Sequence, residues 1–251
     1  MTTFITAYLK IYDEEYDMSR TFENRLKHFT HLLELGINIC IFIEPELENK
    51  FNELELKYDN LKVVQSMKIS ELELYKIGDN NQQICNLPAN RNKLKDTKNY
   101  IFLMLAKLEF IKKTIHLNPY NSNYFCWFDF SLPYIFKDIN NTLSKIKKIS
   151  NTKFKQEFIY IPGCWNYKIN NINYLKNNIV WRFCGGFLIG DKKSLIHFYN
   201  MSNDNFLKFL NETQTLVWEV NYWAWLEVVG LISPTWYSAD HNDTIVNVPY
   251  I

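Results

Sequence analysis

The sequence predicts an α/β fold with a central mixed, mostly parallel sheet flanked by helices. A strand, a helix and a second strand follow one another within the first 43 residues, which is the order of a parallel βαβ unit. The 251 residues suffice for a full core and a cleft. The polar, Asn- and Lys-rich stretch at residues 78–98 is typical of an exposed loop rather than of a domain boundary. We therefore expect one domain.

The opening unit begins with a β-rich run at residues 3–8. The helix at residues 19–35 has Ser19 as its predicted N-cap and Gly36 as its C-cap. Apolar residues recur along this helix at helical spacing: Phe22, Leu26, Phe29, Leu32 and Leu33. The second strand, residues 37–43, is almost continuously apolar, so the pattern favours a buried parallel layer.

Further elements follow in order along the chain. We expect helices at residues 46–58, 97–116, 192–201 and 212–229, and strands at residues 61–65, 124–130, 158–161 and 181–190. The helix at residues 97–116 is strongly periodic, and Asn118 with Pro119 ends it. The paired glycines Gly185 and Gly186 interrupt the strand at residues 181–190, where a ligand, a neighbouring chain segment or a bulge would need the space.

Composition excludes several classes of protein. The 28 Lys and Arg nearly balance the 27 Asp and Glu, which argues against a nucleic-acid partner held by a basic field. The start of the chain lacks the features of a secretory signal, and no run of 18 apolar residues predicts a membrane span. These observations predict a soluble, cytoplasmic protein.

The cysteines and aromatic residues carry weaker signals. The five cysteines (Cys40, Cys85, Cys126, Cys164, Cys184) are odd in number and include no C-x-x-C pair, which argues against a disulfide framework and a thiolate zinc site. We expect most of them to be small buried hydrophobes. Aromatic residues make up 16 % of the chain and suit both a tight core and a sugar-binding surface.

Residues at the predicted strand ends are the first candidates for a site, because ligands of open α/β sheets bind outside the carboxyl ends of the strands. They are Thr6, Ala7 and Tyr8, then Glu44, and Asp129 with Ser131. An isolated carboxylate such as Asp129 is costly to bury without a partner. A metal ion, a helix N-terminus or a ligand hydroxyl would satisfy it, and a turn capped around Ser131 is the structural alternative.

Three later segments add candidates. Arg182 is either a clamp for a phosphate or carboxylate or a surface arginine. Glu219, Tyr222 and Trp223 share one helical face, which suits a general base or a sugar-hydroxyl acceptor as well as core packing. The Asp240-His241-Asn242-Asp243 segment has a mixed nitrogen and oxygen ligand set that suits Mn²⁺ better than zinc, or it is a solvated loop.

The common nucleotide and hydrolase motifs are absent. The sequence contains no GxxxxGK[ST], HExxH or GxSxG, and no glycine-rich dinucleotide fingerprint follows the first strand. Strand ends with isolated acids and many aromatic residues remain. A nucleotide diphosphate bound there would need a metal to offset its charge, which is the logic of metal-dependent glycosyl transfer.

Several motifs in order carry a family resemblance: TxxTAY at the start, Lys107 in a helix before NPYNSNYFCWFDFSL, then FCGGFLIG and WEVNYW. Together they resemble the HtrL/YibB (WlaTC) family, whose members are regarded as glycosyltransferases, and the general plan looks like that of GT-A enzymes. The resemblance implies a single GT-A-like, Rossmann-like domain over residues 1–251. Residues 1–135 would form its nucleotide-binding half and residues 136–251 its acceptor-binding half.

The resemblance also implies roles for residues. Asp129 and Glu219 would be catalytic. The donor would be bound by Thr6, Ala7, Tyr8, Glu44, Lys107 and Arg182, and the sugar or acceptor by Ser131, Gly185, Gly186, Tyr222 and Trp223. A divalent cation, Mn²⁺ or Mg²⁺, would be held by Asp129, Asp240 and His241. The sequence departs from the Asp-x-Asp motif of GT-A enzymes, because Trp127 and Ser131 flank Asp129 at the positions where a second acid would stand.

The activity implied is transfer of a sugar from a nucleotide-diphosphate donor, with UDP-sugars favoured, to a hydroxyl of a glycan or glycoprotein. The metal and Lys107 would stabilise the leaving diphosphate, and a carboxylate would take the acceptor proton if configuration inverts. Two alternatives remain: an inactive sugar- or nucleotide-binding protein of the same fold, and a metal-dependent phosphohydrolase or nucleotidyltransferase. The resemblance allows a homodimer.

Overall fold

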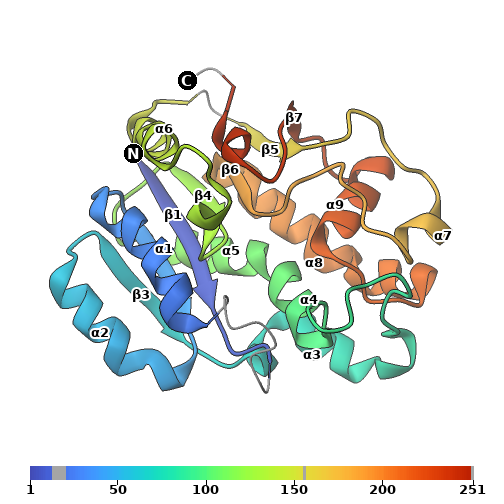
Figure 1. The fold of residues 1–251 in the computed structure, drawn as a ribbon. Coiled ribbons are helices and arrows are strands. Elements are labelled where there is room, and N and C mark those ends of the chain that lie inside the picture. Colours follow the sequence, from blue (N-terminus) through green and yellow to red (C-terminus); the bar gives the residue numbers. More distant parts are fainter. Residues whose placement is uncertain (13–20, 155–156, 250–251) are drawn as a thin grey trace.

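A seven-stranded sheet with the order β3-β2-β1-β4-β6-β5-β7 runs through the computed structural model, which describes residues 1–12, 21–154 and 157–249 (Figure 1). The strands are β1 (Thr2–Tyr8), β2 (Ile39–Ile43), β3 (Leu61–Ser66), β4 (Tyr124–Phe128), β5 (Ile159–Gly163), β6 (Phe187–Asp191) and β7 (Thr235–Ser238). Only β6 runs against its neighbours within this sheet. The predicted mixed, mostly parallel sheet is confirmed.

Helices cover both faces of the sheet. They are α1 (Phe22–Glu34), α2 (Glu48–Lys57), α3 (Glu73–Asn80), α4 (Lys98–Leu105), α5 (Lys107–Leu117), α6 (Ile139–Asn151), α7 (Ile172–Leu175), α8 (Lys192–Thr213) and α9 (Glu219–Val228). Strand side chains alternate between two cores, as in β4, where Phe125 and Trp127 pack with α4, α5, α8 and α9. Cys126 and Phe128 pack on the other face with α1, α2 and α6.

The opening βαβ unit is confirmed by the parallel pairing of β1 with β2. Helix α1 begins after Thr21, whose side chain accepts a hydrogen bond from the Asn24 N–H, so Thr21 is its N-cap. The predicted N-cap, Ser19, lies outside the described residues. Leu35 is the C-cap, and Gly36 follows it with φ +60°, the left-handed conformation in which glycine commonly ends a helix.

The helix predicted at residues 97–116 is two helices. Thr97 caps α4, which ends at Leu105, and Ala106 has φ −77° and ψ −2°, well away from helical ψ. Helix α5 then begins at Lys107 and ends at Asn118 in the left-handed conformation. The periodicity predicts the span but not the break, because the residues around Ala106 are all apolar or favour helices. Lys107 consequently stands at the start of a helix, next to the sheet.

The C-terminal half differs more from the prediction. Residues 181–186 form turns, and strand β6 begins only at Phe187. Helix α8 continues to Thr213 because Phe206, Phe209 and Leu210 bury against the rest of the core. The helix predicted from residue 212 therefore begins later, at Glu219. The short helices α3 and α7 and the longer α6 were not predicted. Asn and Lys are frequent in and around α6 and α7, and α3 is short and ends in Gly-Asp-Asn.

Strands from both predicted halves of the chain pair in the one sheet, β4 from the first half with β6 from the second. Within the described ranges, no helix combines the length and the apolar character needed to cross a membrane.

Candidate active site

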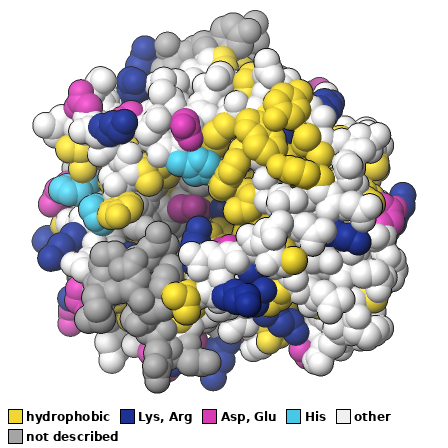
Figure 2. Space-filling view, turned by 45° about the vertical axis from the view of Figure 1, so that its right-hand side comes forward, with side chains coloured by type: hydrophobic (Ala, Val, Ile, Leu, Met, Phe, Trp, Pro, Cys, Tyr) yellow, Lys and Arg dark blue, Asp and Glu magenta, His cyan; other side chains and the backbone are white. Residues whose placement is uncertain are grey.

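A cleft of about 400 Å³ lies at the carboxyl ends of β1 and β4. Figure 2 shows this face of the molecule hollowed, with acidic and basic side chains inside the hollow and a histidine at its rim. Aromatic side chains supply much of the wall: Tyr8, Tyr100, Trp127, Phe130, Trp181 and Trp218. The volume falls in the range of small-molecule sites, and its position is the one expected for ligands of open α/β sheets.

Two carboxylates share one buried ammonium at the base of the cleft. The Nζ of Lys107, whose side chain is 1 % exposed, lies 2.8 Å from Glu219 Oε1 and 3.0 Å from Asp129 Oδ1. It also donates to the Gly185 carbonyl at 2.8 Å. Three acceptors thus take the three N–H donors of the ammonium. Lys107 holds the carboxylates, and its donors are not free to bind a phosphate as the resemblance implied.

The two carboxylates change the pKa values of the groups beside them. Burial by itself lowers the pKa of Lys107, but the Asp129 and Glu219 carboxylates outweigh it and raise the pKa above its ordinary value. Burial, followed by the same two carboxylates, raises the pKa of Tyr100 well above its usual range. Tyr100 lines the cleft, so it presents a neutral hydroxyl to any ligand bound there.

Asp129 is the accessible member of the pair. Its side chain is 41 % exposed, whereas that of Glu219 is 7 % exposed. Oδ1 of Asp129 accepts a hydrogen bond from Trp127 Nε1 at 2.9 Å, in addition to its contact with Lys107. These partners replace the capped turn around Ser131 that was the structural alternative. The strand-end position predicted for Asp129 is confirmed, since β4 ends one residue earlier.

The paired glycines make room for this cluster. A Cβ on Gly185 would lie 2.0 Å from Glu219 Oε1 and 3.2 Å from Lys107 Nζ, so a side chain there would displace the ion pair. A Cβ on Gly186 would meet Asp129 Oδ2 at 3.5 Å, an ordinary contact. The Gly186 carbonyl accepts from the Asp129 N–H at 3.0 Å. Both glycines line the cleft.

Basic residues also line the cleft, and sequence reasoning missed them. Arg25 on α1, His28 one turn later and Lys95 before α4 face the cavity. Arg25 lies over the Tyr8 ring, and Lys95 over the Tyr100 ring at 5.0 Å. Neither cation forms an ion pair with a carboxylate of the described ranges. The polar face of an amphipathic helix and an Asn- and Lys-rich loop gave no signal that could have singled them out.

Trp218 is a further cleft residue that the sequence did not indicate. Its side chain lines the cleft and is 3 % exposed, yet its Nε1 has no hydrogen-bond partner among the described residues. A buried donor without a partner is costly, and a ligand acceptor in the cleft would satisfy it.

The predicted donor residues divide between the cleft and its surroundings. Ala7, Tyr8 and Ser131 line the cleft. Thr6 is fully buried behind it, and Glu44 lines an adjoining cavity of about 130 Å³, where it accepts from the Lys10 N–H.

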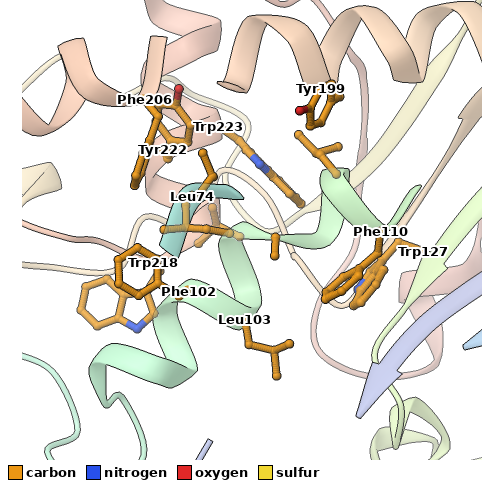
Figure 3. Packing of buried hydrophobic residues seen from close by; sticks show 14 of the residues in the cluster. Leu74, Phe102, Leu103, Phe110, Trp127, Tyr199, Phe206, Trp218, Tyr222 and Trp223 are labelled. Atoms are coloured by element: carbon orange, nitrogen blue, oxygen red, sulfur yellow. The ribbon is translucent and has the colours of Figure 1, made fainter. Parts of the chain in front are cut away.

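Three predicted residues lie away from the cleft. The Arg182 guanidinium makes a buried bidentate pair with Glu227, both contacts at 2.8 Å, which leaves it no free face for a donor phosphate. Tyr222 and Trp223 are fully buried in the core, as Figure 3 shows for their packing with Phe206 and Tyr199. Core packing, the alternative for this face of α9, applies to them, and only Glu219 of the three reaches the cleft.

The expected metal ligands do not form one group. His241 lines the cleft and lies 3.3 Å, through Nδ1, from Asp240 Oδ1, but Asp240 points outside the cleft lining. Within the described part of the chain, the metal-capable group with closely spaced donor atoms is Cys164, Cys184 and His241, without Asp129. Asp129 therefore lies apart from the closely spaced donor atoms that include His241.

Asp243 of the same segment has a structural position. It accepts hydrogen bonds from the Lys137 and Asp138 N–H groups and from Thr142 Oγ1 ahead of and within α6. Burial raises its pKa, but these hydrogen bonds prevail and lower the pKa to about 2. Asp243 therefore anchors the C-terminal segment instead of serving the cleft.

Two of the solved structures to which the chain is similar are named here for the fold. Mouse xyloside xylosyltransferase 1, in its apo form, is 7 % identical with a TM-score of 0.47, covering 96 % of this chain and 86 % of that one. The 4-diphosphocytidyl-2C-methyl-D-erythritol synthase of Anaerococcus prevotii is 11 % identical with a TM-score of 0.45, covering 98 % and 88 %. At these scores neither likeness carries an argument about chemistry. No curated protein matches the chain.

The sequence family is clear. Residues 1–238 match the family described as "Bacterial protein of unknown function (HtrL_YibB)". This match covers nearly the whole chain and confirms the resemblance seen in the motifs. The chain belongs to the HtrL_YibB family.

Proposed function

We propose that this protein is a glycosyltransferase that moves a sugar from a nucleotide-diphosphate donor to a hydroxyl of a glycan or glycoprotein. One observation carries the proposal: the cleft combines a carboxylate pair on a buried lysine with a rim of basic side chains. A nucleotide sugar has matching parts, because its diphosphate is anionic and its sugar presents hydroxyls. The aromatic wall suits the base and the sugar ring.

The basic rim supports binding of the diphosphate. Arg25, His28 and Lys95 line the cleft, and the guanidinium of Arg25 can bind two phosphate oxygens at once. Charge that develops on the leaving diphosphate would be stabilised by these cations, an effect that is commonly the largest single contribution to catalysis. UDP-sugars remain the favoured donors.

The carboxylates support the transfer step. We assign Asp129 as the general base: it takes the proton of the acceptor hydroxyl while the oxygen bonds to the sugar anomeric carbon. The bond from that carbon to the diphosphate breaks, and the nucleoside diphosphate leaves. Glu219 lines the cleft beside it and would orient the acceptor, while Lys107 holds both carboxylates in place. An inverted product configuration is the outcome expected of this assignment.

The divalent cation remains a prediction. Both Asp129 and the neighbouring Glu219 are paired with Lys107, and neither belongs to the closely spaced group of metal-capable donors among the described residues, whereas a hard cation takes six or more oxygen ligands. A cation that arrives with the diphosphate would supply charge neutralisation there. We also propose that the protein acts in the cytoplasm and catalyses a step of glycan biosynthesis.

The first experiment measures thermal unfolding of the full chain with UDP, GDP, CDP, ADP or dTDP, each with Mn²⁺, with Mg²⁺ or with EDTA. A ligand at 100 times its dissociation constant adds about 2.7 kcal/mol, which shifts the midpoint of a chain this size by roughly 5 to 10 °C. Arg25→Gln and Lys95→Gln should reduce the shift. Lys93→Gln, an exposed lysine of the same loop, is the matched control.

The second experiment uses the nucleotide sugar that corresponds to the nucleotide found to bind. It measures hydrolysis of this donor and transfer of its sugar, with and without candidate acceptors. Slow donor hydrolysis and sugar transfer that disappear in Asp129→Ala support the transferase. Binding without turnover in the wild-type chain supports the inactive binding protein, and release of inorganic phosphate without transfer supports the phosphohydrolase. Absence of a shift with every nucleotide contradicts the donor site itself.

A further inference from the structure

Three strand ends converge beside the cleft and bring two cysteines and a histidine together. Cys164 follows β5, Cys184 precedes the antiparallel β6, and His241 follows β7, which is parallel to β5. All three positions therefore lie at one edge of the sheet. The sequence shows no sign of this group, because the sheet pairing joins segments that are far apart in the chain.

Backbone hydrogen bonds fix these segments to one another. The Cys184 N–H donates to Pro162 O at 2.7 Å, the Cys164 N–H to Trp181 O at 3.0 Å, and the Ala239 N–H to Gly163 O at 2.9 Å. The ring of His241 packs edge to face against Trp181, with centroids 4.5 Å apart. The backbone thus places the three side chains before any ligand binds.

The donor atoms have the spacing of a metal site. One ligand atom each from Cys164, Cys184 and His241 lies within 4.8 Å of the others. The two sulfurs are 3.6 Å apart, far longer than the roughly 2.05 Å of a disulfide. Two thiolates bound to one tetrahedral zinc at about 2.3 Å lie about 3.8 Å apart, close to the spacing seen.

A neighbouring carboxylate completes the surroundings. Asp240 Oδ1 lies 3.3 Å from His241 Nδ1 and 3.5 Å from Cys164 Sγ. A carboxylate beside a metal-binding histidine commonly fixes its tautomer and orientation. Two thiolates also balance the charge of a divalent ion, and thiolate with imidazole is a ligand set that selects zinc over Mg²⁺ or Mn²⁺.

We propose that Cys164, Cys184 and His241 bind one zinc ion at the rim of the cleft, with Asp240 holding the imidazole. This set shares His241 and Asp240 with the Mn²⁺ or Mg²⁺ set implied by the resemblance, but it has two cysteines in place of Asp129. It does not depend on the proposed function. It joins the segment after β7 to the turn that precedes Gly185, whose carbonyl accepts from Lys107. Zinc would therefore fix one wall of the cleft.

The test is the metal content of the full chain, purified under reducing conditions and dialysed against zinc and then against buffer. We expect about one zinc per chain, lost in Cys164→Ser, Cys184→Ser and His241→Ala. Cys85→Ser is the matched control, because Cys85 is a half-buried cysteine outside the group. Cobalt in place of zinc should give the sulfur-to-metal charge-transfer band of thiolate ligation, absent in the two serine variants.

Asp240→Asn gives a test that does not disturb a buried residue, since the Asp240 side chain is 70 % exposed. Competition with a chelator should show zinc affinity about 10- to 100-fold weaker in this variant, the usual effect of losing an outer partner of a ligand. Zinc content unchanged by the Cys164→Ser/Cys184→Ser double variant overturns the proposal. So does a wild-type chain that takes up no zinc, or one in which the two cysteines form a disulfide instead.

Discussion

Two buried cations, Lys107 and Arg182, each hold a glutamate of the same helix, α9, and the two sites differ in one respect. Lys107 binds Glu219 in the first turn, and Arg182 binds Glu227 near the end. The Arg182 pair is closed: the guanidinium uses two nitrogens on Glu227 and a third on the Trp165 carbonyl. Lys107 instead shares its charge with the half-exposed Asp129, which faces the cleft.

The difference distinguishes an ion pair closed within the core from one that faces the cleft. Glu227 lies at the negative end of the α9 dipole, so Arg182 offsets an unfavourable position. Glu219 lies at the positive end, where a carboxylate is already favoured, and needs less help from Lys107. The ammonium of Lys107 can therefore pair with Asp129 as well as with Glu219. The sequence offered Arg182 as a clamp for a phosphate or carboxylate or as a surface arginine, and the resemblance implied that Lys107 binds the donor; in the structure each cation binds a glutamate of α9.

Removal of either cation should have the largest effect. Lys107→Met leaves the buried Glu219 carboxylate without its cation, and Arg182→Met leaves Glu227 only the exposed Lys168 at 3.5 Å. We expect the free energy of unfolding to fall by about 3 to 5 kcal/mol in each variant. Urea unfolding measures this. The double variant Arg182→Met/Glu227→Gln should recover part of the loss, because it removes the unpaired charge. A single-variant loss below about 1 kcal/mol would mean that water screens the pair.

Asp129→Asn should separate chemistry from stability. The amide still accepts from the Trp127 indole, so the chain should fold, but a general base is lost and turnover should fall by about 10² to 10⁴. Glu212→Gln is the matched control, since Glu212 also accepts from an indole, that of Trp225. Equal turnover in the two variants, measured as sugar transfer at saturating donor, would remove Asp129 from the mechanism.

Local patterns predicted much of the fold. The β1-α1-β2 unit and the strand-end position of Asp129 follow from apolar periodicity and from a charge after an apolar run, both of which lie within a few residues of sequence. Helix α8 shows where local reasoning fails. The polar run around Asn203 and Asp204 resembles a loop, yet the helix continues because Phe206 and the residues after it bury against the core.

The candidate site depended on contacts that no spacing reveals. Glu227, the partner of Arg182, is 45 residues away, and Glu219, a partner of Lys107, is 112 residues away, so the sequence could not indicate these acceptors. Cys164 and His241 meet because β5 and β7 pair in parallel. Asp129 was found from a single strand, whereas the roles of Lys107, Arg182 and Trp223 required the sheet order.

Gly185→Ala and Gly186→Ala should differ in their effects, because Gly185 lies against Glu219 and Gly186 lies against Asp129. The new methyl at position 185 would force Glu219 away from Lys107, and we expect a stability loss of about 1 to 3 kcal/mol together with weaker transfer. The methyl at position 186 meets only ordinary contacts, so it should cost well under that in stability. Urea unfolding and turnover of the two variants, side by side, give the comparison. Equal losses would contradict the close approach of Glu219.

The smallest effect is expected at Asp243, a carboxylate held by neutral donors instead of a cation. Burial raises its pKa, but the Lys137 N–H, Thr142 hydroxyl and Asp138 N–H bonds lower it to about 2, below the ordinary 3.8. A depressed folded-state pKa means that this stability is fully present above about pH 4 and is lost as pH falls toward 2. After allowance for its exposure the contribution is about 1 kcal/mol. Asp243→Asn should unfold more easily than wild type at pH 6 and about equally at pH 2, as measured by urea titration at both values. If wild type and Asp243→Asn differ in free energy of unfolding by the same amount at both pH values, Asp243 acts through packing and not through its charge.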